Sequence, residues 1–123
     1  MGNPVNIKEE ITRAIGAHGL WKGRLLSAIK EGSSEFSVDN VRTDKFCIFG
    51  QWLYSLPADV RSLTHWQAVR QLHGEFHLEA AKILALALRG DKAQAQAALA
   101  DDSSYVDISS RLTRAMMVWR NAS

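Results

Sequence analysis

The sequence predicts an all-α protein, a four-helix-bundle-like domain with additional short helices. Apolar residues recur at intervals of three and four over long stretches, which is the pattern of helices that bury one face. The chain has only two prolines, and it shows few of the strict apolar-polar alternations that indicate strands. Its 123 residues are a usual length for one domain, so residues 1–123 are expected to form a single folding unit.

Turn-forming residues divide the chain into the expected helices. The first helix follows Asn3-Pro4 and is expected to end at Gly32-Ser33-Ser34, and a loop over residues 35–40 follows it. The hydroxyl of Thr43 is expected to cap a shorter second helix, which the pair Leu56-Pro57 ends. The expected helices span residues 5–31, 43–55, 62–88, 91–99 and 104–119.

Composition excludes several classes of protein. The 15 basic and 13 acidic residues give a net charge of +2, and no basic stripe supports nucleic-acid binding. No apolar run is long enough for direct insertion into a membrane. One cysteine alone forms no internal disulfide, which favours a reducing compartment and a cytoplasmic protein.

Three histidines and the cysteine lie at apolar positions. His73 and His77 fall on the apolar face of the helix over 62–88, and His18 falls within the apolar stripe of the first helix. Cys47 lies in the apolar segment Phe46-Cys47-Ile48-Phe49-Gly50. The fourth histidine, His65, is about 80° away from His73 around its helix and is not counted as a ligand.

A metal ion gives these residues a common role. Two histidines spaced i, i+4 lie about 40° apart on a helix, so both imidazoles can reach one ion. Three histidines and one thiolate would complete the tetrahedron of a zinc ion, which prefers nitrogen and sulfur ligands. Spacing alone leaves a second interpretation open, in which the histidines are core residues satisfied by backbone or water and Cys47 is a small buried hydrophobe.

The residues around these positions resemble a known family. The chain reads Ala17-His18-Gly19-Leu20-Trp21, then Cys47-Ile48-Phe49-Gly50-Gln51-Trp52, then His73-Gly74-Glu75-Phe76-His77. This order resembles the chemoreceptor zinc-binding domain family, with its His and nearby aromatic, its Cys-x-Phe-Gly-x-Trp segment and its His-x-x-x-His pair. The resemblance covers roughly residues 11–88 and matches all four ligand positions, His18, Cys47, His73 and His77.

The resemblance implies a sensory domain and not an enzyme. Family members are cytosolic homodimers attached to chemoreceptor or diguanylate cyclase output domains. They sense zinc, and in chemoreceptors also oxidants such as hypochlorous acid, through the zinc-bound cysteine. For this chain it implies a redox-reactive Cys47, while Trp21 and Trp52 are expected to shield the site and Gly50 to allow close approach of another helix.

Two other interpretations remain. The zinc could have a purely structural role, in which it holds the helices together and regulates nothing. A hydrolase is disfavoured because the pair reads His-Gly-Glu-Phe-His and lacks the His-Glu-x-x-His order that places a general base, and because four protein ligands leave no open position for water. Gly16, Gly19 and Gly23 form a separate stripe on the first helix, expected to pack closely against a neighbouring helix, either within the chain or across a dimer.

Overall fold

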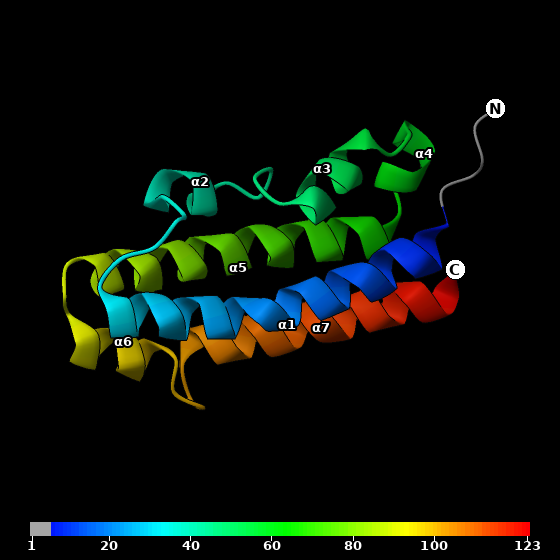
Figure 1. Cartoon of the computed structure of the whole chain (residues 1–123). Helices are drawn as coiled ribbons and strands as arrows, with labels where there is room; N and C mark the ends of the chain where they lie inside the picture. The colour runs from blue at the N-terminus through cyan, green and yellow to red at the C-terminus, as the bar shows by residue number, and fades with distance from the viewer. Residues whose placement is uncertain (1–5) are drawn as a thin grey trace.

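Three long helices form the body of the protein. The computed structural model describes residues 6–123, which fold into seven helices. The long ones are α1 (Ile7–Glu31), α5 (Thr64–Leu88) and α7 (Ser104–Ala122), and each of the three contacts the other two. Figure 1 shows α1 and α5 running in the same direction and α7 running back against them.

A series of short helices forms the fourth side of the bundle. Figure 1 shows this stretch, here called the 38–61 segment, lying along α5 and returning toward the start of α1. The segment therefore takes the place of a fourth antiparallel helix, and the predicted all-α bundle with additional short helices is confirmed. The short helices are α2 (Val38–Arg42), α3 (Ile48–Ser55), α4 (Ala58–Arg61) and, between α5 and α7, α6 (Lys92–Ala98).

One apolar core joins the long helices. The face predicted for the helix over 62–88 is buried throughout: Trp66, Val69, Phe76, Ala80, Leu84 and Ala87. Against it pack Leu25 of α1 and Met116 and Trp119 of α7, each with no more than 2% of its surface exposed. The polar residues of α5 that share this face, His73 and His77, are therefore carried into the core by the same periodicity.

The ends of α1 follow its local sequence. The Asn6 side chain accepts a hydrogen bond from the Glu9 backbone N–H at 3.1 Å, and Gly32 ends the helix with φ of 71°. This left-handed conformation suits glycine, which has no Cβ to clash there. The predicted start of this helix at residue 5 lies outside the described residues.

The region between α1 and α5 differs from the prediction. Residues 38–42, expected to lie in or beside a loop, form α2, whose N-terminus is capped by Ser37 Oγ and whose Val41 is fully buried. Residues 43–47, expected to begin a helix, are not helical. A five-residue helix is too short to show an apolar period, which is why the sequence pattern missed it.

The glycine stripe of α1 does not pack within the chain. Gly16, Gly19 and Gly23 are exposed, and a Cβ atom added at any of them would meet no atom within 4 Å. The expected close packing against another helix of the same chain is therefore wrong. Among residues 6–123, no helix has the length and apolar character needed to cross a membrane.

Candidate metal centre

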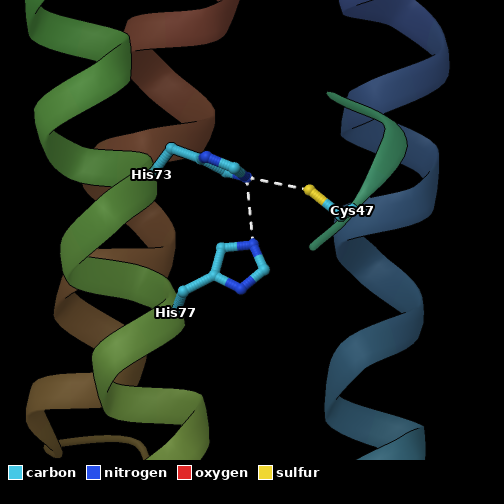
Figure 2. Close-up of side chains that lie close together, drawn as sticks. All are labelled: Cys47, His73 and His77. Carbon is cyan, nitrogen blue, oxygen red and sulfur yellow. Dashed lines mark hydrogen bonds between the residues drawn. The ribbon is translucent and has the colours of Figure 1, made fainter. Parts of the chain in front are cut away.

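His73 and His77 lie one turn apart on the buried face of α5. Their exposed fractions are 4% and 1%, and their Nε2 atoms are 3.1 Å apart. Figure 2 shows the two rings leaving the same side of the helix and converging. Their spacing of four residues puts both imidazoles beside one point in space, as the sequence predicted.

Cys47 reaches this point from the 38–61 segment. Its Sγ lies 3.2 Å from His73 Nε2, and one of the two dashed lines in Figure 2 joins these atoms. Cys47 is not inside a helix as expected; it is the N-cap of α3, and its sulfur accepts a hydrogen bond from the Gly50 backbone N–H at 3.3 Å. A helix N-terminus favours negative charge, so this position supports a thiolate.

The thiol and the imidazoles have shifted pKa values. Burial raises the pKa of the Cys47 thiol, and the backbone N–H groups of Gly50 and Phe49 oppose that effect. Burial, reinforced by the charge of His77, lowers the pKa of His73 to about 3. Burial also lowers the pKa of His77. The imidazoles are therefore neutral, with lone pairs available, and a cation is what would hold the sulfur as a thiolate.

Val41 fixes the orientation of one imidazole. The Val41 carbonyl oxygen lies 2.9 Å from His77 Nδ1, and because a carbonyl only accepts, Nδ1 carries the proton and donates it. The Nε2 lone pair of His77 is then directed at the cluster. A backbone carbonyl that holds the second nitrogen of a histidine ligand is a regular feature of zinc sites. No side-chain pattern marks a backbone acceptor, so the sequence did not predict this contact.

Gly50 allows the chain to fold tightly around Cys47. A Cβ atom at this position would overlap the Asp44 carbonyl oxygen and would lie 3.2 Å from His73 Cε1. The close approach predicted at Gly50 is therefore made by the loop before α3 and by a histidine ring of the cluster. The Asp44 carboxylate in turn accepts a hydrogen bond from the Tyr54 hydroxyl at 2.7 Å, which ties this loop to α3.

His18 lies beside the cluster and not within it. The sulfur and the two imidazole nitrogens of Cys47, His73 and His77 all lie within 4.8 Å of one another, and His18 is not part of this group. Its Nε2 is 2.8 Å from Ser109 Oγ on α7. The four side chains nevertheless line one cavity of about 380 Å³ between the helices. Burial, followed by the charge of His77, lowers the pKa of His18 to about 4.

The two tryptophans come from different helices and make different contacts around the centre. Trp21 is buried on α1, and its ring meets the ring of His77 edge-on, with 6.1 Å between centroids. Trp52 is half-buried on α3, where it stacks on Phe49 at 5.6 Å. Phe49 in turn lies edge-on to the ring of His73 at 5.2 Å. One tryptophan thus contacts the histidine pair directly and the other only through Phe49.

The donor set fits a zinc ion. Zinc binds imidazole nitrogen at about 2.0–2.1 Å and thiolate sulfur at about 2.3 Å, so a tetrahedral ion places its donor atoms roughly 3.3–3.6 Å apart. The 3.1 Å and 3.2 Å distances within the cluster are close to these values. The sulfur ligand excludes calcium and magnesium, which require oxygen. His73 Nδ1 is buried and has no hydrogen-bond partner among the described residues, unlike His77 Nδ1.

The comparison with protein families agrees with this geometry. The family model of the chemoreceptor zinc-binding domain matches residues 18–84, more than half of the chain. The chain belongs to this family. The matched stretch begins at His18 and includes Cys47 and the histidine pair. No curated protein and no solved structure matches the chain.

Proposed function

We propose that this chain is a cytoplasmic sensory domain that holds one zinc ion through His18, Cys47, His73 and His77 and responds to zinc supply or to oxidants. The observation that carries the proposal is the convergence of one sulfur and two imidazole nitrogens, all within 4.8 Å, on a buried face of the bundle. Membership of the chemoreceptor zinc-binding domain family supports it.

The residues of the site give Cys47 its sensory role. When zinc is bound, it stabilises the deprotonated sulfur, which is the nucleophilic form. Cys47 is half-buried and lines the cavity, so a small oxidant can reach it. Reaction of the thiolate with hypochlorous acid gives a sulfenic acid and a chloride ion, and the sulfur loses its negative charge.

This change weakens the link between the 38–61 segment and α5. Sγ is the N-cap of α3 and the only donor of the cluster that the segment supplies. Once the sulfur no longer attracts the cation, the short helix α3 is free to shift against the long helices. A movement of this segment would be transmitted to an attached chemoreceptor or diguanylate cyclase domain.

The proposal includes a homodimer and no catalytic activity. Four protein ligands would leave no zinc position open to an activated water. The exposed glycine stripe of α1 has no partner within the described chain, and Leu20 and Leu26 beside it are 59% and 47% exposed. A second copy of the chain packed on this face would cover those side chains.

Metal analysis of purified variants tests the proposed site. We expect the wild-type chain to bind one zinc ion. The zinc affinity of Cys47→Ala, His73→Ala and His77→Ala should each fall by more than about 100-fold, a larger loss than substitution of a residue that only supports a metal ligand usually causes. His18→Ala should lose less, because His18 lies outside the preformed cluster. The matched control is His65→Ala, a change on the same helix as the pair. Unchanged affinity in the Cys47 and His73 variants would end the proposal.

A purely structural zinc is the second candidate, since zinc at this point would join the 38–61 segment to the long helices. Circular dichroism with and without a strong chelator separates the two. A sensor should keep its helical signal after zinc removal, because most of the side chains buried between α1, α5 and α7 are apolar and bind no metal. If the site is purely structural, the chain should lose most of its helical signal when zinc is removed.

A further inference from the structure

His18 makes a contact outside the three-residue cluster. Its Nε2 lies 2.8 Å from Ser109 Oγ, a hydrogen bond that joins α1 to α7. The ring also packs against Phe76 of α5, with 4.3 Å between centroids. In this position, neither ring nitrogen of His18 belongs to the group of donor atoms that all lie within 4.8 Å of one another.

A fourth zinc ligand must lie closer to the donor atoms of Cys47, His73 and His77 than His18 does. A tetrahedral zinc ion requires donor atoms roughly 3.3–3.6 Å apart. A donor atom that lies more than 4.8 Å from even one of the others therefore cannot share the ion. His18 lines the same cavity as Cys47, His73 and His77, so the space for the movement exists. To become a ligand, the imidazole must turn or shift toward the cluster, and if Nε2 is the nitrogen that binds the ion, it leaves Ser109.

We propose that Ser109 is a positioning residue that holds His18 away from the cluster, and that His18 exchanges its partner from Ser109 to the metal when zinc binds. The inference rests on the proposed zinc-binding function. The exchange requires that Nε2, the nitrogen that contacts Ser109, becomes the zinc ligand, because one Nε2 lone pair cannot serve both partners. Zinc binding thereby removes one link between α1 and α7, which makes α7 responsive to the state of the site although it supplies no ligand. Binding through Nδ1 would leave the bond to Ser109 in place and would overturn the exchange.

The zinc affinity of Ser109→Ala tests the exchange. The matched control is Ser110→Ala, an exposed serine next to it on α7. Competition with a chromophoric chelator should show Ser109→Ala binding zinc about fivefold more tightly than the wild type, because the metal-free variant has no hydrogen bond to break, a bond typically worth about 1 kcal/mol. Ser110→Ala should stay within about twofold. Unchanged or weaker binding in Ser109→Ala would overturn the exchange.

The ring nitrogens of His18 give a second readout. We expect their ¹⁵N chemical shifts to differ between the wild type and Ser109→Ala without metal and to coincide with zinc bound. A difference that persists in the zinc-bound state would mean that Ser109 keeps its bond, and would overturn the exchange. If the wild type bound no zinc, the proposed function would fail as well. If the wild type bound zinc and His18→Ala bound it less tightly, but Ser109→Ala did not differ from the wild type, only the exchange would fail.

Discussion

The two parts of the cluster of Cys47, His73 and His77 come from regions of different construction. Its histidines belong to α5, a 25-residue helix buried against α1 and α7. Its cysteine belongs to the 38–61 segment, whose helices have five, eight and four residues. Isolated helices this short are unstable in water, so the segment depends on what it packs against. A metal ion bound by side chains of both regions would therefore stabilise the 38–61 segment more than it stabilises α5.

Few apolar side chains of the 38–61 segment are fully buried. Val41, Leu53 and Leu56 are its buried apolar residues, and the Trp66 indole N–H donates to the Leu53 carbonyl oxygen at 3.0 Å. The bond between His77 and the Val41 carbonyl belongs to the centre itself. Regions with few buried contacts open first under native conditions. In the proposed function, the 38–61 segment is therefore the part that a change at Cys47 moves, while α5 keeps His73 and His77 in place.

Phe76→Ala should have the largest effect on stability, because it breaks the long-helix body. Phe76 is 1% exposed and packs against Tyr105 of α7 and the ring of His18. We expect urea denaturation of the metal-free chain to show a loss of about 3–5 kcal/mol in the free energy of unfolding. Phe46→Ala, a half-buried phenylalanine within the 38–61 segment, should lose less. Equal losses would contradict the distinction between the two regions.

Acid should weaken the metal-free fold through the histidines. The folded-state pKa values of His18 and His73, about 4 and about 3, lie below the ordinary 6.5, and that of His77 is also lowered. The unfolded chain therefore binds protons first, so stability is complete above pH 6.5 and falls as the pH drops toward 4. Each such group contributes a slope of up to about 1.4 kcal/mol per pH unit.

Urea denaturation at pH 7, 6 and 5 measures this slope. His73→Phe should show a shallower pH dependence than the wild type, because it removes one of the groups that the folded state keeps neutral. Parallel curves for the two proteins would contradict the assignment of the slope to the buried histidines.

The sequence predicted the regular parts of this molecule well. Apolar periodicity placed the long helices and put His73 and His77 on a buried face, because that period directly reflects burial. It failed between residues 38 and 47, where α2 replaces a loop and Cys47 precedes a helix instead of lying in it. Tertiary contacts decide this stretch: the burial of Val41 and the packing of the Asp44 carbonyl on Gly50. The hydrogen bonds of His18 to Ser109 and of His77 to Val41 join residues far apart in sequence, and no local pattern encodes them.

Gly50→Ala should disturb the 38–61 segment and leave the long helices intact. The added methyl group overlaps the Asp44 carbonyl oxygen, so backbone must move, at a cost of about 1–3 kcal/mol in the free energy of unfolding. The movement occurs at the third residue after Cys47, so Sγ leaves its place beside His73. We expect zinc affinity to fall by roughly tenfold, the lower end of the effect of residues that support metal ligands.

Gly74→Ala is the matched control for this change. Gly74 is also a helical glycine that faces Asp44, but its added Cβ would meet only the carboxylate Oδ2, at an ordinary contact distance of 3.7 Å. Alanine is the better helix former by about 1 kcal/mol, so this variant should be as stable as the wild type or more so, with unchanged zinc affinity. If both variants bound zinc like the wild type, the position of Cys47 would not depend on the loop before α3. If both lost zinc affinity equally, α5 would be as easily displaced as the segment, and the contrast between the two regions would be wrong.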